Sequence, residues 1–331
     1  MRFLRRALLF TVVVLVAIVA GAALWAQWPR TPPSGEDVAA PGSGPVTVTW
    51  LGVSAVLLRD GDSAILIDPF FTRKPAKLGL LTNRPVRPDE ARIRDWLERL
   101  QIDHLDAVVV SHAHYDHALD AGVVARLTDA QLLGSQSTAQ IGRGAGLDDK
   151  RIIFVEAGTQ VQAGRFRLRF LASRHAGATG GRPRGTIAEP LVPPAGPLAY
   201  RMDQTWSIVV DHPRTRLLHH GSAGFEPGAL EGVRVDTVLL GVALIDNLPA
   251  YLDAVVGQVA PARVYAVHWD DFTRPLSEPL RPLPVGVDLP AFFAQARTRY
   301  PAVRFQTLPL GDAVALPRAQ EARTSSASPD A

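Results

Sequence analysis

The sequence contains no cysteine, which excludes disulfide bonds, thiolate metal sites and cysteine nucleophiles. A metal ion in this chain would have to be held by histidine and carboxylate side chains. Lysine is scarce, with three among the 35 basic residues. The first thirty residues hold four arginines and no acid, whereas the rest is nearly neutral, with 31 basic and 32 acidic residues. Charge therefore gives no support for a nucleic-acid-binding face, and we expect no nucleic-acid partner.

The N-terminal segment lacks charge over a long stretch. Residues 7–25 form an uncharged run of nineteen residues after three arginines, long enough to cross a hydrocarbon core of about 30 Å as a helix. We expect residues 1–30 to be an uncleaved signal anchor, that is, a transmembrane helix that tethers the chain to the inner membrane. Cleavage after Ala23 is the alternative and would give a secreted protein. The arginines before the run place the body outside the cytoplasm, in the periplasm.

The remaining chain reads as one globular unit with two appendages. Residues 31–44 are rich in Pro and Gly and are interpreted as a linker. Residues 318–331 have the composition of a disordered tail. The domain then covers residues 45–317. Hydrophobic residues make up 47% of the whole chain, which is enough for a large core.

Short β-strand patterns open this domain, and β/α alternation follows. Two runs, 55–59 and 64–67, flank an Asp-Gly turn signal and predict a hairpin, and a second hairpin is expected at 161–172. Hairpins followed by β/α alternation favour two mixed sheets packed together, with helices on both outer faces. Two Gly/Pro-rich stretches, 72–88 and 176–197, are too long for simple connectors and are candidate site loops.

Three of the nine histidines and a carboxylate fall within six residues, directly after the apolar run 105–110. In the sequence Ser-His-Ala-His-Tyr-Asp-His, His112 and His114 project from one side of an extended segment, while Asp116 and His117 fall in the turn before the next helix. Imidazole and carboxylate suit Zn²⁺, with Mn²⁺ or Fe²⁺ as alternatives, and one or two ions are expected. Two neighbouring ions would stabilise both sides of a hydrolytic transition state.

This run resembles the H-x-H-x-D-H signature of the metallo-β-lactamase-fold hydrolases. The resemblance extends from Val46 to Phe272, through Trp-Leu-Gly at 50–52, Ile-Asp-Pro at 67–69, Ser-Arg-His at 173–175 and Val-His-Trp at 267–269. This order is similar to that of the N-acyl phosphatidylethanolamine phospholipase D branch and of the bacterial ascorbate-phosphate lactonase group. It implies a four-layer αββα sandwich of two mixed β-sheets.

The resemblance also implies the role of each site residue. One metal would be held by His112, His114 and His175, and the other by Asp116, His117 and His268. Asp68 would be a buried carboxylate that orients a ligand without binding metal itself.

One position departs from the family pattern. Where the family has an aspartate that bridges the metals, this chain has Ser222, a neutral and poor ligand. One of the two residues before Gly221, His219 or His220, is a candidate substitute ligand or proton donor, and exposure to water at the strand end is the alternative. We take Asp116 and His220 as candidate catalytic groups. His104 and His212 lie outside every motif and are interpreted as surface residues.

These observations predict a metal-dependent hydrolase in which a metal-bound hydroxide attacks a phosphodiester of a small or lipid-like substrate. Lactone or ester hydrolysis is the alternative reaction. The loss of the bridging aspartate also leaves open a non-catalytic metal- or ligand-binding relative.

Overall fold

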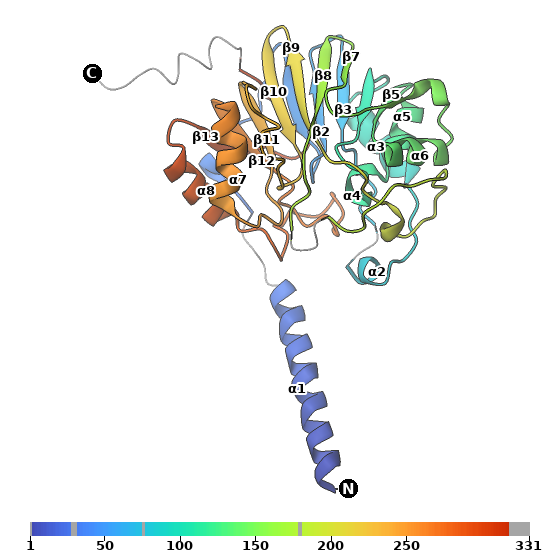
Figure 1. Cartoon of the computed structure of the whole chain (residues 1–331), viewed down its shortest axis with the longest axis vertical. Helices are drawn as coiled ribbons and strands as arrows, with labels where there is room; N and C mark the ends of the chain where they lie inside the picture. The colour runs from blue at the N-terminus through green and yellow to red at the C-terminus, as the bar shows by residue number, and fades with distance from the viewer. Residues whose placement is uncertain (1, 28–31, 75–76, 178–180, 318–331) are drawn as a thin grey trace, which may run out of the picture.

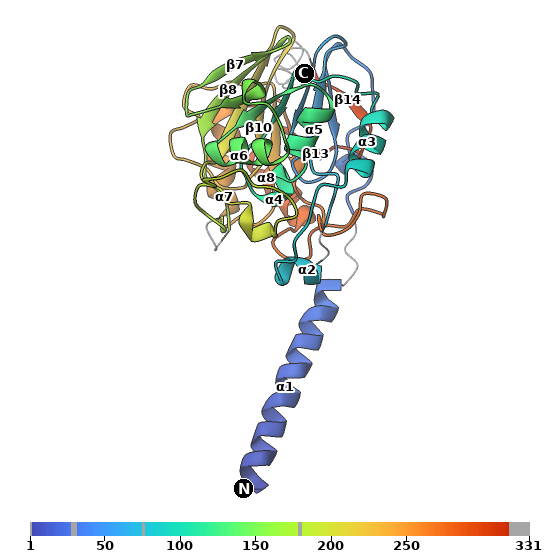
Figure 2. The ribbon, with the colours of Figure 1, turned by 90° about the vertical axis from the view of Figure 1, so that its right-hand side faces the viewer.

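The computed structural model describes residues 2–27, 32–74, 77–177 and 181–317. Within residues 32–317, two seven-stranded β-sheets pack face to face, and helices cover both outer faces (Figure 1 and Figure 2). This arrangement agrees with the two mixed sheets expected from the sequence. The predicted tail, residues 318–331, lies outside the described residues.

The first sheet has the strand order β14-β1-β2-β3-β4-β5-β6. Its pairs from β14 to β3 are antiparallel, and those from β3 to β6 are parallel. The hairpin signal at Asp60–Gly61 joins β2 to β3 as predicted. The strands are β1 (Thr47–Trp50), β2 (Val56–Arg59), β3 (Ala64–Ile67), β4 (Ala107–Val109), β5 (Gln131–Gly134), β6 (Ile152–Phe154) and β14 (Ala313–Ala315).

The second sheet has the order β13-β12-β11-β10-β9-β8-β7. Pairs from β7 to β10 are antiparallel, and pairs from β10 to β13 are parallel. The carboxyl ends of β10, β11 and β12 therefore meet at one edge, where their loops can form a site. The strands are β7 (Gln160–Ala163), β8 (Phe166–Ala172), β9 (Trp206–His212), β10 (Thr215–His220), β11 (Thr237–Gly241), β12 (Arg263–Val267) and β13 (Arg304–Thr307).

Helices cover the outer faces, and several of them begin at side-chain caps. Asp89, Ser135 and Asp288 each accept a hydrogen bond from a backbone N–H in the first turn of their helices. Helix α5 packs on β4 and β5, α6 on β5 and β6, and α8 on β13. The helices are α1 (Arg2–Gln27), α2 (Lys77–Leu81), α3 (Glu90–Arg99), α4 (Tyr115–Ala118), α5 (Ala121–Leu127), α6 (Gln136–Gly144), α7 (Leu248–Leu252) and α8 (Leu289–Arg299), with 3-10 turns η1 (Gly35–Asp37), η2 (Asp149–Arg151) and η3 (Pro197–Ala199) and the π turn η4 (Asp253–Gly257).

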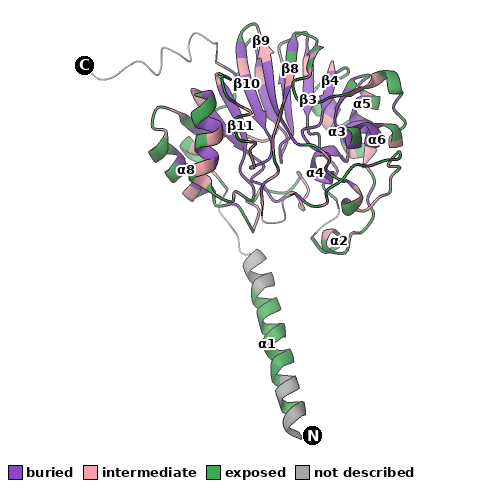
Figure 3. Ribbon diagram, viewed as in Figure 1, coloured by how far each residue is buried: buried purple, intermediate pink, exposed green. Residues whose placement is uncertain are grey.

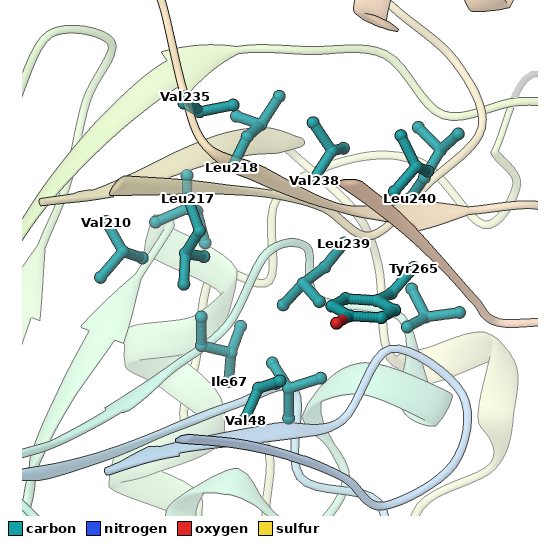
Figure 4. Close-up of a cluster of buried hydrophobic side chains, with 14 of the residues drawn as sticks. Val48, Ile67, Val210, Leu217, Leu218, Val235, Val238, Leu239, Leu240 and Tyr265 are labelled. Atoms are coloured by element: carbon teal, nitrogen blue, oxygen red, sulfur yellow. The ribbon is translucent and has the colours of Figure 1, made fainter. Parts of the chain in front are cut away.

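The main core lies between the two sheets. Val48 and Ile67 of the first sheet point toward Leu217, Leu239 and Tyr265 of the second (Figure 4). The next residues along β10 and β11 point the opposite way, toward the outer helices. Both faces of β10, β11 and β12 are therefore buried, which explains the continuous apolar runs in these strands (Figure 3), whereas β7 and β8 alternate between buried and exposed residues.

The structure does not support the expected transmembrane anchor, residues 1–30. A helix does form, α1, and its described side chains are exposed (Figure 3). Within the part of the chain that the structure describes, no helix has the length and apolar character needed to span a bilayer. Residue 1 and residues 28–30 lie outside the described residues. The location outside the cytoplasm stays a prediction.

Part of the segment interpreted as a linker, residues 31–44, is packed onto the body. Residues 35–42, here called the strap, cross from one sheet to the other. Ala39 N–H donates to Thr307 O of the second sheet, and Gly42 N–H donates to Ala313 O of the first, both at 2.9 Å. Gln306 Nε2 donates to Glu36 O at 2.9 Å. The Pro/Gly composition signalled an irregular backbone but not that its polar groups would find partners on two sheet edges.

His212, interpreted as a surface residue, is also corrected. Its side chain is 4% exposed, and its Nε2 lies 2.9 Å from the buried carboxylate of Asp60. Packing of β9 against the β2–β3 turn buries the pair. His104 is exposed, as expected.

We predict that a chain beginning at residue 32 folds with the stability of the full chain, whereas one beginning at residue 46 is about 2–3 kcal/mol less stable. The second chain loses the three strap hydrogen bonds, each contributing about 1 kcal/mol. Urea unfolding followed by tryptophan fluorescence measures both. Asp37→Asn is the matched control, because it removes only the exposed ion pair with Arg297 and should cost under about 1 kcal/mol. Equal stability of the two truncated chains would show that the strap contributes nothing.

Candidate metal centre

Six of the predicted site residues gather at one edge of the sandwich, although they come from three distant parts of the sequence. Two lie in the loop after β4 and two in the short helix α4, which forms where the sequence predicted a turn. One follows β8 and one follows β12. They form two groups, His112, His114 and His175, and Asp116, His117 and His268, and in each group one ligand atom per residue lies within 4.8 Å of the others.

Four buried imidazole nitrogens among the described residues have no hydrogen-bond partner, and two of them are Nε2 atoms of ligand candidates, one in each group. His112 Nδ1 lies 3.3 Å from Ser111 Oγ, which leaves its Nε2 free. His117 Nδ1 lies 2.8 Å from Asp68 Oδ2, which leaves its Nε2 free as well. A buried polar atom without a partner costs about 1–3 kcal/mol, a cost that a bound metal ion would remove. The residues present therefore fit a metal at both positions.

The other two histidines of the first group are also held by one nitrogen only. His114 Nε2 faces the carbonyl oxygens of Gly181 and Pro183 at 3.1 and 3.3 Å, so its Nδ1 is left over. His175 Nδ1 faces the carbonyl oxygen of Ala176 at 2.6 Å, so its Nε2 is left over. A carbonyl accepts only from an N–H, which fixes the tautomer and presents the other nitrogen as a lone pair. The described residues Ala176, Gly181 and Pro183 of the loop 176–197 thus contact the first group.

The histidines of the first group are neutral, as metal ligation requires. Burial, reinforced by neighbouring histidines, lowers the pKa of His112 well below its usual value. Burial likewise lowers the pKa of His114 and brings the pKa of His175 to about 4. Three neutral imidazoles side by side avoid mutual charge repulsion.

The second group carries the negative charge of the site. Burial acts to raise the pKa of Asp116, but His117 and His268 outweigh it and hold that pKa far below its usual range. Burial acts to lower the pKa of His117, but the carboxylates of Asp68 and Asp116 raise it overall. Asp116 Oδ2 lies 3.4 Å from His268 Nε2 and 3.7 Å from His117 Nε2. The carboxylate is therefore ionised and adjacent to both imidazoles.

Asp68 lies beneath the loop after β4 that begins the histidine run, residues 110–114, here called the metal loop. It contacts residues that belong to or support both groups. Its Oδ1 accepts from Ser111 N at 2.7 Å, and its Oδ2 accepts from Ser111 Oγ at 2.5 Å and contacts His117 Nδ1. Ser111 in turn faces His112. Sequence reasoning overlooked Ser111, although it stands directly before the histidine run. Asp68 also has a positive φ of 50°, so its backbone conformation is uncommon for a non-glycine residue.

His220, predicted as a catalytic candidate, has no ring nitrogen available in the structure. Its Nδ1 faces Ser207 Oγ and its Nε2 faces Gly224 O, both at 2.7 Å. Its ring packs against Tyr251, and burial lowers its pKa to about 4. His220 is thus a buried residue whose ring is held by the fold, and these contacts do not support its predicted catalytic role, which stays a prediction.

His219 points to the other face of β10, toward the metal loop. Its Nε2 faces Ser54 O at 2.9 Å and lies 4.0 Å from Asp68 Oδ2. His219 is fully buried, so the alternative of a strand-end residue exposed to water is excluded for both histidines. The period of two along a strand separates these neighbours, which sequence alone left equivalent.

Ser222 lies beside the first group. Its Oγ accepts from the backbone N–H of Ala176, the residue after His175, at 3.3 Å. Asp116 is the one carboxylate among the six ligand candidates. The serine leaves the site without the second negative charge that the resemblance implies at this position.

The comparisons with known proteins agree with this geometry. Residues 48–234 match the family model described as the metallo-beta-lactamase superfamily, which is more than half of the chain. The chain belongs to the metallo-β-lactamase superfamily. The matched segment includes both groups except His268, which the structure brings in from beyond it. The finer resemblance to the phospholipase D branch stays a prediction.

Curated relatives match shorter segments. A UPF0173 metal-dependent hydrolase of Cupriavidus necator is 30% identical over 138 residues, which cover 41% of each chain. Another from Archaeoglobus fulgidus is 35% identical over 86 residues, or 26% of this chain and 29% of the relative. The chain thus spans less than half the length of either relative.

Solved structures share the fold at low identity. An isothiocyanate hydrolase from Delia radicum gut bacteria has a TM-score of 0.52 and 14% identity, covering 82% of this chain and all of its own. Igni18, a metallo hydrolase from Ignicoccus hospitalis, has a TM-score of 0.50 and 17% identity, covering 81% of this chain and 97% of its own. These likenesses show the fold alone.

We predict that Ser222→Asp raises the number of metal ions retained at limiting supply. A second carboxylate offsets the mutual repulsion of two dications better than Asp116 alone. Elemental analysis after titration with Zn²⁺ or Mn²⁺, on protein purified without chelator, measures the stoichiometry. Ser222→Ala is the matched control and should leave it unchanged. Two tightly held ions in the unaltered protein would contradict the prediction, because another group would then already replace the aspartate.

Proposed function

We propose that this chain is a metal-dependent hydrolase whose ions bind at the two groups described above. The observation that carries the proposal is the pair of unpartnered buried nitrogens, His112 Nε2 and His117 Nε2, one in each of two adjacent ligand groups. Superfamily membership supports the same reaction class. Zn²⁺ suits the donor set best, with Mn²⁺ or Fe²⁺ as alternatives.

Divalent ions at such a site supply Lewis-acid polarisation of the bond to be broken and make hydroxide available near neutral pH. The protein supplies position and charge. Asp68 holds His117 directly and His112 through Ser111, so the ligand rings are fixed before substrate arrives. Asp116, whose side chain is 12% exposed, places the ionised carboxylate where it can accept a proton from an incoming water.

The loops around the site favour an anionic, partly apolar substrate, and we assign a phosphodiester with a lipid-like portion. Loops 72–88 and 176–197 are joined by reciprocal backbone hydrogen bonds between Val86 and Ala195 at 2.9 Å. Helix α2 in the first loop exposes Leu78 and Leu81 by 74% and 84%. Several exposed arginines on and beside these loops have no ion pair among the described residues: Arg84, Arg87, Arg182, Arg184 and Arg201. Arginine matches phosphate oxygens in geometry and charge.

The second candidate is a non-catalytic metal-binding relative. Ser222 favours it, because a weakly charged site holds fewer ions. Such a protein would bind metal and hydrolyse nothing.

We predict that the protein hydrolyses phosphodiesters that carry an acyl chain. The kcat/KM for such a substrate should be higher than the kcat/KM for a phosphodiester with the same headgroup and no acyl chain. The assay uses zinc-loaded full-length protein with phosphodiester, lactone and simple ester substrates. His112→Ala is the inactive comparison, because it leaves its group with two ligands, and His104→Ala is the matched control at an exposed position. A lactone or ester preference would overturn the substrate class alone. No turnover of any substrate by a protein that retains its metal would favour the binding candidate.

A further inference from the structure

A buried ion pair lies beside the second ligand group and belongs to none of the site residues. Arg73 NH2 lies 2.6 Å from Asp270 Oδ2, and the two side chains are 1% and 0% exposed. Within the described residues, neither of these atoms has a further hydrogen-bond partner. Arginine and aspartate are rarely buried so completely unless they are paired, and taking both out of water is costly. We therefore looked for the contacts that this ion pair supports.

Asp270 connects this pair to the metal ligand His268 through one intermediate residue. Asp270 Oδ1 accepts from the backbone N–H of Val53 at 2.8 Å. The carbonyl oxygen of Val53 accepts from the backbone N–H of His268 at 2.7 Å. It also accepts from Trp50 Nε1 at 2.8 Å. The backbone of His268, on the second sheet, is thereby fixed to the β1–β2 loop of the first.

Three residues of this connection have unusual backbone conformations. The φ angles are 50° at Val53, 47° at Arg73 and 56° at His268. A β-branched residue such as valine is a clear outlier at positive φ. Conformations of this kind persist only where the surrounding contacts enforce them. The ion pair and the two hydrogen bonds supply that enforcement at Val53.

The first sheet leaves room for the guanidinium. Gly52 has a φ of 88°, and a Cβ at this position would lie 1.8 Å from Arg73 NH2. Only glycine therefore lets the guanidinium reach Asp270. The close approach ties loop 72–88 to the turn that holds His268.

We propose that Arg73 is a positioning residue that, through Asp270 and Val53, sets the orientation of His268 and so the affinity of the second metal site. The inference rests on the proposed role of His268 as a metal ligand. Arg73 acts by neutralising Asp270, whose other oxygen then holds Val53 N–H and turns the Val53 carbonyl toward His268. Among the described residues, no hydrogen bond or ion pair connects Arg73 to the first group, so we expect that group to be independent of it.

Stepwise titration of the metal-free full chain with Co²⁺, followed by visible absorption, tests this, because the spectrum reports ligand geometry at each site. Arg73→Lys keeps the charge and loses the planar guanidinium. In this variant we expect the ion at the second group, here called the second ion, to bind ~10-fold more weakly or worse and with an altered spectrum. The first ion should bind unchanged. Arg73→Met should show a larger loss, so lysine gives a partial rescue; if Arg73→Met does not fold, Arg73→Lys decides alone.

Arg165→Lys is the matched control, since Arg165 pairs with Asp62 at 2.7 Å on the exposed surface. It should leave both ions unaffected. Wild-type affinity for both ions in Arg73→Lys, or equal weakening of both, would overturn the inference. His268→Ala separates the two proposals. If His268→Ala loses the second ion and Arg73→Lys keeps it, only the inference about Arg73 fails. If His268→Ala keeps the second ion, the assignment of His268 as a ligand fails, and the inference fails with it.

Discussion

A single buried carboxylate, that of Asp68, supports residues of both ligand groups. It accepts two hydrogen bonds from Ser111 and faces His117 Nδ1, so one residue at the end of β3 fixes the loop after β4 and orients rings in both groups. A buried carboxylate is costly unless its oxygens are satisfied, and these contacts satisfy them. The arrangement needs β3 and β4 to be parallel neighbours, because only then do their carboxyl ends meet.

The local part of this site could be predicted from sequence. The His112–His117 run carries four ligand candidates in six residues, so its chemistry could be inferred without knowledge of the fold. The two remaining histidines, His175 and His268, were placed by their order in the family pattern, and the structure brings both to the run. The hairpin at Asp60–Gly61 and the alternation on 161–172 likewise depend on neighbours in sequence, and both formed where predicted.

Features that depend on contacts between distant residues could not be predicted. His219 and His220 are adjacent and equivalent in sequence. Because neighbouring residues of β10 point to opposite faces of the sheet, His219 points toward Asp68 and His220 toward Tyr251. The strap has the composition of a linker, and only two sheet edges left open by β13 and β14 give its backbone partners. Arg73 lies in a Gly/Pro-rich loop, and nothing nearby in sequence indicates its buried partner, 197 positions later.

Metal binding by Asp68→Asn tests most directly whether Asp68 supports both groups. Asparagine keeps the size and one acceptor but removes the charge that favours His117 Nδ1–H and the Ser111 hydroxyl donor. Equilibrium dialysis against Zn²⁺, with circular dichroism to show that the variant folds, measures the affinity of each ion. We predict that a folded Asp68→Asn binds both ions roughly 10- to 100-fold more weakly. Wild-type affinity for both ions would contradict the central role of Asp68.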